Sequence, residues 1–272
     1  MSAVILALLE SPAAATAVLR AAARAAQLMR ARKINVLAIR APAKSAKLEN
    51  PDSNGPATAV ERARTLQLRA AFQEWAAGAE NRLVPIEWVE VEGHAAAVLQ
   101  EWGSHADLIV LQQPGERDAE RRPVQTALFE ASKPVLVVPQ AAGATSADTT
   151  SFGRRIAVAW RNDTRTEAAV RGALQWLGTG AEVHVMAGAK RWETPPALPQ
   201  IFADTGVAAR FHILPMTGQR SFGEALLARA HELDVDLMVL GAFAHPMLFG
   251  PILGGVTRHM LANADLPVLM RY

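Results

Sequence analysis

Asp107-Leu-Ile-Val-Leu111 and Asp236-Leu-Met-Val-Leu240 are two copies of one pattern, an aspartate followed by four apolar residues. Each copy follows a stretch with helical spacing of apolar residues, and each leads through a loop and a helix to a second apolar run. Those runs are Pro134-Val-Leu-Val-Val138 and Pro267-Val-Leu-Met270. The chain of 272 residues therefore contains an internal repeat of domain size.

The two halves also begin alike, with a short apolar run followed by an alanine-rich segment of helical spacing. Apolar runs that alternate with helices are typical of strands buried on both faces of a parallel sheet. Besides the four runs above, we expect strands at Val4–Leu9, Ile34–Arg40, Ile86–Val91, Ile156–Trp160, Glu182–Met186 and Ala209–Leu214. The sequence thus predicts an α/β fold of two tandem domains, each a five-stranded parallel sheet flanked by helices.

A small, polar segment separates the halves and predicts a linker. We place the first domain at residues 1–140, the linker at 141–153 and the second domain at 154–272. The halves differ in the segment that connects their second and third expected strands. The first half has a long helix near 57–80 there, whereas the second has the short, proline-bearing segment 187–199. In the long helix, one face is expected to carry Val60, Leu68, Phe72 and Trp75.

Composition excludes several classes of protein. The chain has no cysteine, so disulfides, thiolate metal sites and a cysteine nucleophile are excluded. The formal net charge is only +2, and the basic residues are distributed along the chain. They do not cluster on one surface, as a nucleic-acid interface requires. Since no apolar run approaches the roughly 20 residues of a membrane span, we expect no membrane partner and a cytoplasmic location.

Function is expected where parallel strands end, because ligands bind beyond the carboxyl ends of the strands, where the strand order reverses. Directly after Leu240 comes Gly241, whose small size lets main-chain amides approach an anion. Gly254-Gly255-Val256-Thr257 then opens an expected helix, whose free N–H groups and positive dipole end would hold a phosphate. The glycines could equally form an ordinary turn, and the residues alone leave both interpretations open.

Three stretches of the second half resemble a known family: Asp236-Leu-Met-Val-Leu-Gly-Ala-Phe-Ala-His245, Leu253-Gly-Gly-Val-Thr-Arg258 and Leu266-Pro-Val-Leu-Met270. Together they resemble the closing signature of the universal stress protein family, in its tandem two-domain form. Nucleotide-binding members carry Gly, two residues, Gly, nine residues, Gly and then Ser or Thr. This sequence matches at Gly241 and Gly254, but has Ala244 at the second glycine and Gly255 at the Ser or Thr.

The resemblance implies domains of the adenine nucleotide alpha hydrolase-like type and, in the second half, a pocket for ATP or AMP, with magnesium present only alongside the nucleotide. Binding members place an Asp just after the first strand, where this sequence has Arg161, two residues before Asp163. The expected pocket residues are Trp160, Arg161, Met186, Gly241, Phe243, Ala244, Gly254, Gly255, Val256 and Thr257. The first half lacks the glycine pattern, so we expect it to be degenerate and to bind no nucleotide.

The family also pairs domains through their last strands, which here would join the two halves as a pseudo-dimer within one chain. Further homodimerisation and protein partners are left open. No catalytic constellation is visible, and His94, His105 and His212 stand isolated in the sequence.

The first functional hypothesis is therefore a cytosolic universal stress protein, a regulatory binding module of the stress response and not an enzyme. The second hypothesis is a nucleotide-free protein-interaction module of the same fold. An ATP-hydrolysing or adenylyl-transferring enzyme would need His245, His259 or Asp163 as its base or metal ligand, and weak ATP hydrolysis is left open.

Overall fold

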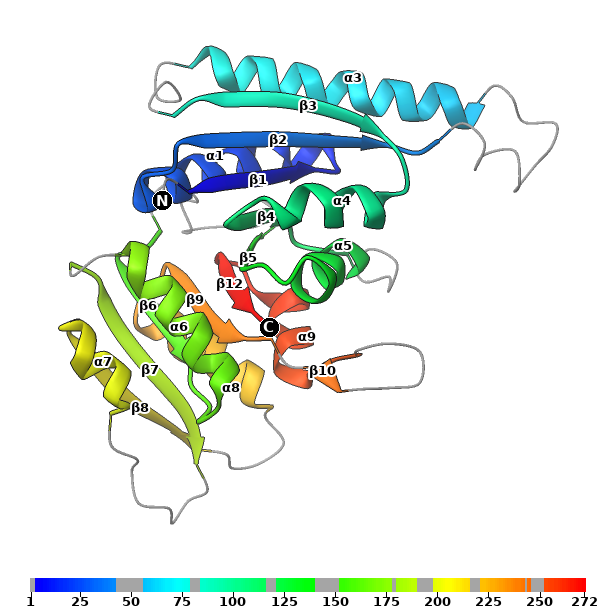
Figure 1. Cartoon of the computed structure of the whole chain (residues 1–272). Coiled ribbons are helices and arrows are strands. Elements are labelled where there is room, and N and C mark those ends of the chain that lie inside the picture. Colours follow the sequence, from blue (N-terminus) through cyan, green and yellow to red (C-terminus); the bar gives the residue numbers. More distant parts are fainter. Residues whose placement is uncertain are drawn as a thin grey trace.

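The structure is a computed structural model that describes residues 3–42, 56–78, 84–115, 121–139, 152–177, 180–189, 198–215, 221–242, 244–245 and 252–272. A ten-stranded sheet runs through the whole molecule (Figure 1). The first half supplies, in spatial order, β3 (Ile86–Glu92), β2 (Lys33–Arg40), β1 (Val4–Leu9), β4 (Leu108–Gln112) and β5 (Val135–Val138). The second half continues with β12 (Val268–Arg271), β9 (Leu237–Gly241), β6 (Arg155–Ala159), β7 (Glu182–Ala189) and β8 (Ala209–Pro215).

Each half is a parallel five-stranded sheet, as predicted, and the halves meet through their last strands. β5 and β12 pair antiparallel, with Leu136 opposite Leu269. The carboxyl ends of the strands therefore point to opposite edges of the sheet in the two halves. Ligand sites at strand ends would lie on opposite sides of the molecule.

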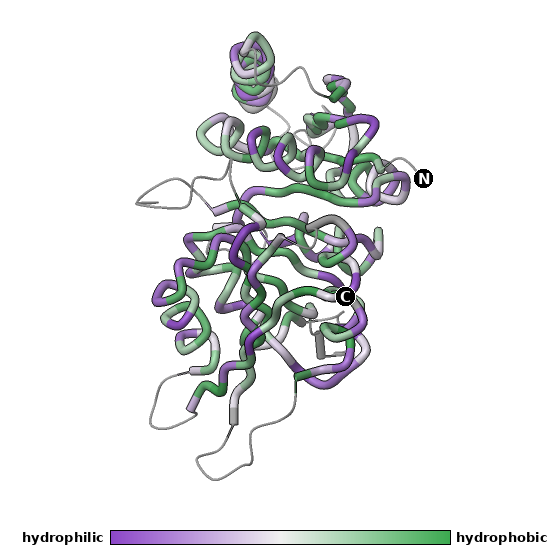
Figure 2. Tube along the Cα trace, turned by 90° about the vertical axis from the view of Figure 1, so that its left-hand side faces the viewer, coloured by the Kyte–Doolittle hydropathy of each residue, from purple (hydrophilic) through white to green (hydrophobic). Residues whose placement is uncertain are grey.

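Helices cover both faces of the sheet, and each face holds one apolar cluster that runs through both halves. One face carries α1 (Pro12–Met29), α3 (Pro56–Ala77), α6 (Thr164–Leu177) and α7 (Gln200–Thr205). The other carries α4 (Ala95–Ser104), α5 (Arg122–Gln125), the π-helix η3 (Thr126–Glu130), α8 (Phe222–Glu232) and α9 (Gly255–Asn263). Figure 2 shows green and purple alternating around the helices, as amphipathic helices require.

The repeated aspartates anchor the sheet. Asp107 accepts a hydrogen bond from the N–H of Val4 at 2.8 Å, at the start of the neighbouring strand. Asp236 accepts hydrogen bonds from the main-chain N–H groups of residues 153–155, just before and at the start of β6. Each carboxylate thus satisfies main-chain donors where a central strand begins, which explains the repeat in structural terms.

Every expected strand is present, and the largest difference is that β7 continues past Met186 to Ala189. The continuous apolar runs are buried as predicted, because helices cover both faces.

Three expectations need correction. Val60 does not belong to the buried face of α3, since it is 69 % exposed, whereas Leu68 and Trp75 are buried. Val60 belongs to the amino-terminal turns of α3, and these turns extend past the strand ends (Figure 1). The short helix α7 was not expected in the second half. The helix that the sequence predicts before the apolar run 134–138, at Val124–Ala131, begins at Arg122 and becomes a π-helix at Thr126.

Candidate functional site

In the second half, the carboxyl end of β9 lies directly against the start of α6. A Cβ placed on Gly241 would lie 2.9 Å from the main-chain nitrogen of Thr166 and 3.1 Å from its hydroxyl. Glycine is therefore required at position 241 by helix packing, whether or not a ligand binds there.

Gly254 is the N-cap residue of α9, with Gly255 as the first helical residue, so the predicted helix start is confirmed. Among the residues that the structure describes, nothing lies within 4 Å of a Cβ placed on Gly255. Val256 packs against the apolar cluster, and Thr257 is 1 % exposed. Within the described part of the chain, the hydroxyl of Thr257 has no hydrogen-bond partner, which is costly for a buried polar group.

Arg161 lies just past the carboxyl end of β6. Its side chain is 70 % exposed and pairs with Asp163 at 3.4 Å. Asp163 in turn accepts a hydrogen bond from the N–H of Thr166 at 2.9 Å, which caps α6. Asp163, named as one candidate for a catalytic base, therefore has a structural role at the start of α6.

Trp160 and Met186 are joined by one main-chain hydrogen bond of 2.8 Å, but their side chains lie on opposite faces of the sheet. The Trp160 ring packs against Phe202 of α7, with ring centroids 6.0 Å apart. Met186 is buried in the other cluster, beneath α8 and α9. The structure therefore does not bring the Trp160 ring to the start of α9.

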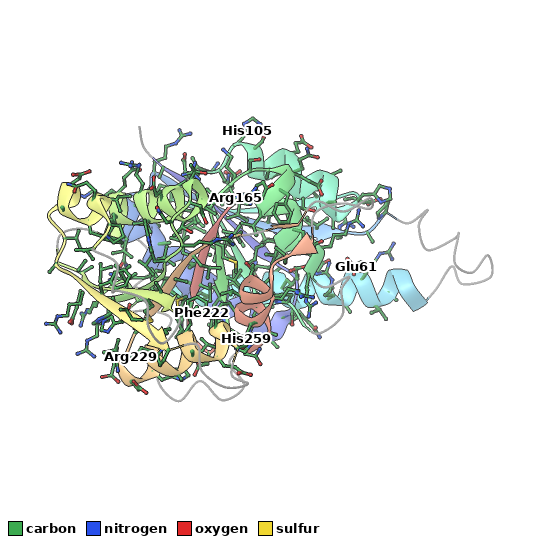
Figure 3. The ribbon with its side chains drawn as sticks, turned by 90° about the horizontal axis from the view of Figure 1, so that it is seen from below. Glu61, His105, Arg165, Phe222, Arg229 and His259 are labelled. Carbon is green, nitrogen blue, oxygen red and sulfur yellow. The ribbon has the colours of Figure 1, made fainter. Side chains whose placement is uncertain are left out.

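Phe243 lies outside the described residues. Ala244 is described only as part of β10 (Ala244–His245), which pairs with β11 (Ile252–Leu253) just before α9. Of the histidines near the glycines, His259 packs against Gly223 where α8 and α9 meet, beside Phe222 (Figure 3).

The first half contains a cavity of about 500 Å³ that sequence reasoning missed. It lies at the carboxyl ends of β1 and β2, beside the point where the strand order reverses between β1 and β4. Its apolar side is formed by Leu8, Leu9, Ile39 and Leu99. A concave apolar site of this size, at a switch point, is where ligands bind in parallel α/β folds.

α3 closes this cavity with a charged pair. Arg64 donates hydrogen bonds to the carbonyl oxygens of Glu10 at 2.9 Å and Ile39 at 2.6 Å, where β1 and β2 end. It also donates to the carboxylate of Glu61, one turn earlier in α3. This hydrogen bond holds the pKa of Glu61 below its usual value, against the opposing effect of burial. The long helix, for which the sequence predicts an apolar packing face, therefore also builds a wall of the cavity.

Further polar groups line the rim. His94 precedes α4 and Arg122 begins α5, and within the described residues neither side chain has a hydrogen-bond or ion-pair partner. Thr126 is buried and donates its hydroxyl to Glu130 at 3.2 Å. The cavity thus combines an apolar base with one unpaired arginine and one unpaired imidazole.

Glu10 is the residue that the sequence could have pointed to. It directly follows β1 and lines the cavity. The family resemblance implies an Asp just after the first strand, and the first half has a glutamate at this position. Glu61 and Arg64, which also line the cavity, lie more than fifty positions further along the chain, and no sequence signal links them to β1.

His212 is not isolated, contrary to expectation. Its Nε2 lies 3.0 Å from Nδ1 of His184, which is 2 % exposed, and its Nδ1 lies 3.4 Å from a guanidinium nitrogen of Arg229 on α8. Because Arg229 can only donate, His212 donates from Nε2 to His184. Burial lowers the pKa of both histidines. Figure 3 shows Arg229 far from Glu61, at the other end of the molecule.

Within the described residues, no group of three or more His, Asp or Glu side chains is arranged to hold a metal ion. Among the described helices, none is both long and apolar enough to cross a bilayer.

Comparison with protein-family models and with curated proteins finds no match. Among solved structures, a universal stress protein from Archaeoglobus fulgidus DSM 4304 matches with a TM-score of 0.73 and 13 % identity, over 100 % of this chain and 96 % of that one. A functionally unknown protein from Pseudomonas aeruginosa PAO1 matches with a TM-score of 0.58 and 16 % identity, over 99 % and 92 %. At these identities the likeness concerns the fold. The chain therefore has, along its whole length, the fold of a universal stress protein with two tandem domains.

Proposed function

We propose that the chain is a binding and regulatory module of the universal stress protein type, which acts in the cytoplasm and has no catalytic turnover of its own. The observation that carries this proposal is the cavity of about 500 Å³ at the carboxyl ends of β1 and β2. Its volume lies within the range of about 300–1,000 Å³ that is usual for small-molecule sites.

An adenine nucleotide is the ligand class we propose, with magnesium only alongside it. The apolar side of the cavity would receive a flat base, and Arg122 and His94 would face the phosphate. Glu10 and Glu61 also line the cavity, and their charge opposes a triphosphate. AMP is therefore favoured over ATP at this site.

The start of α9 is a second candidate position for the phosphate, as the family resemblance implies. Its support, within the described residues, is the space around Gly255 and the buried hydroxyl of Thr257, which has no hydrogen-bond partner among them. The free N–H groups of the first helical turn would add donors to the phosphate.

A nucleotide-free interaction module is the second candidate function. It is favoured by the position of Arg64, which already occupies the carbonyl oxygens of Glu10 and Ile39. Main-chain groups that a ligand could use at the strand ends are thus taken by the protein itself.

Calorimetric titration with AMP and with ATP, magnesium present, tests these alternatives. Ala96 lines the cavity and Ala97 does not, so Ala96→Trp and Ala97→Trp form a matched pair on α4. Gly254→Asp places a carboxylate at the start of α9. We expect Ala96→Trp to abolish the heat of AMP binding and Ala97→Trp to leave it unchanged.

Loss of binding in Gly254→Asp alone would move the nucleotide to the second half. Absence of heat and of any thermal shift for the unmodified protein at millimolar nucleotide would refute nucleotide binding and favour the interaction module.

A further inference from the structure

A second cavity, of about 260 Å³, lies at the junction of the two halves. Met29 and Leu108 of the first half and Leu269 of the second form part of its apolar wall. Junctions between domains are preferred ligand sites, and a volume just below about 300 Å³ restricts the occupant to a compact molecule.

Arg271, the last residue of β12, lines this cavity and is half-buried. One of its guanidinium nitrogens would lie 3.6 Å from a Cβ placed on Gly172, so the small residue in α6 leaves it room. Within the described part of the chain, its guanidinium has no hydrogen-bond or ion-pair partner. A half-buried arginine typically packs its aliphatic stem and keeps its charged head accessible, so the guanidinium of Arg271 is available to an anion in the cavity.

Asp107 lines the same cavity, and its carboxylate accepts fewer hydrogen bonds than it could. It receives one hydrogen bond, from the N–H of Val4, whereas its repeat equivalent Asp236 receives hydrogen bonds from three main-chain N–H groups. Asp107 is exposed to solvent and forms no ion pair with Arg271. The two charges therefore line one cavity without contacting each other.

The second half shows that the repeat does not need this arrangement. The counterpart of Arg271 in the repeat is Val138, which is buried and apolar. Beside Asp236, Phe152 is 1 % exposed and accepts a hydrogen bond from Arg24 through its carbonyl oxygen. Unpaired opposite charges thus occur at only one of two equivalent places, and folding alone does not explain them.

We propose that the junction cavity binds a free α-amino acid with a small aliphatic side chain. The carboxylate of the ligand pairs with Arg271, and its ammonium group pairs with the available oxygen of Asp107. The aliphatic side chain contacts Met29, Leu108 and Leu269. Such a ligand meets both unpaired charges and touches both halves, so it stabilises their relative position.

The test measures the binding of L-valine to the whole 272-residue chain by thermal shift and by calorimetric titration. N-acetyl-L-valine lacks the ammonium charge and L-valinamide lacks the carboxylate. We expect L-valine to bind and to raise the melting temperature, and each analogue to bind at least about tenfold more weakly, a difference of about 1.4 kcal/mol.

Arg271→Met and Asp107→Asn are expected to weaken L-valine binding by the same factor. Asp107→Asn keeps an oxygen for the N–H of Val4, so it preserves the anchor of β1. Arg171→Met, on the neighbouring exposed residue of α6, is the matched control and should bind normally. Gly172→Leu fills the cavity and should abolish binding.

Equal binding of L-valine and N-acetyl-L-valine would overturn the proposal in favour of a simple anion site. Lack of any L-valine binding at about 20 mM, far above the range of about 1 mM at which weak sites fill, would also overturn it. Neither result bears on nucleotide binding, which uses other residues.

Discussion

Replacing Gly241 by alanine is a direct test of how β9 and α6 are packed. The added Cβ would lie 2.9 Å from the main-chain nitrogen of Thr166 and 3.2 Å from the carbonyl carbon of Arg165. These are main-chain atoms of the first turn of α6, so they cannot rotate away as a flexible side chain would. The helix start must shift, and the shift strains the hydrogen bond between Asp163 and the N–H of Thr166.

Overpacking of this kind costs about 1–3 kcal/mol of unfolding free energy. A protein of this size class loses about 2–4 °C of melting temperature per kcal/mol, so we expect Gly241→Ala to melt roughly 2–12 °C lower. Urea unfolding followed by far-UV circular dichroism should show a lower midpoint with an unchanged slope, since the surface exposed on unfolding is the same.

Gly255→Ala is the matched control, because no described residue lies within 4 Å of a Cβ at the start of α9. Alanine is favoured over glycine in a helix by up to about 1 kcal/mol, so this variant should be as stable as the unmodified protein or more so. If Gly241→Ala unfolds at the same urea concentration as Gly255→Ala, the close contact between β9 and α6 is refuted.

Three further predictions concern other contacts. Arg64→Met leaves the carbonyl oxygens at the ends of β1 and β2 without their donor, and we expect it to lower stability by about 1–3 kcal/mol in urea titrations; an unchanged midpoint would contradict the bridging role. The pKa values of His184 and His212 are lowered by burial, so the unfolded chain binds more protons. Stability from this pair should therefore be present above the unfolded pKa of about 6.5 and fall as the pH is lowered below it, and His212→Gln should reduce this fall. Equal pH dependence of the two proteins would exclude the pair as its cause. Phe152→Ala should cost about 3–5 kcal/mol in the same assay, because the ring is 1 % exposed, and a loss under about 1 kcal/mol would show that the site collapses around the cavity.

The strands could be predicted because burial on both faces forces continuous apolar runs, and those runs are visible in the sequence at Val4–Leu9 and Leu237–Gly241. The matching order of strands and helices in the two halves could be predicted from the internal repeat. Val60 was misplaced because helical spacing shows which residues share a face, but not where the sheet beneath that face ends. The helix α7, with six residues, is too short for its periodicity to stand out.

The site was harder to predict than the fold. The start of α9 at Gly255 was correctly located, because glycines after a strand are a local signal. The cavity in the first half was missed, because Arg64 reaches the end of β1 from a helix far along the chain. Arg161 and Trp160 were placed in the pocket from their positions in sequence, but the structure shows the first exposed and the second turned toward α7.

The antiparallel pairing of β5 and β12 within one chain affects how the two halves stay together on dilution and how their sequences can diverge. Two separate subunits joined by such a pairing would come apart on dilution, whereas a tethered pair keeps its partner at a high effective concentration at any dilution. A homodimer must also place every substitution on both sides of its axis. Within one chain each half mutates alone, so a glutamate, Glu10, can follow β1 while an arginine, Arg161, stands at the equivalent position of the second half, and one ancestral pocket can be kept, altered or lost independently of the other.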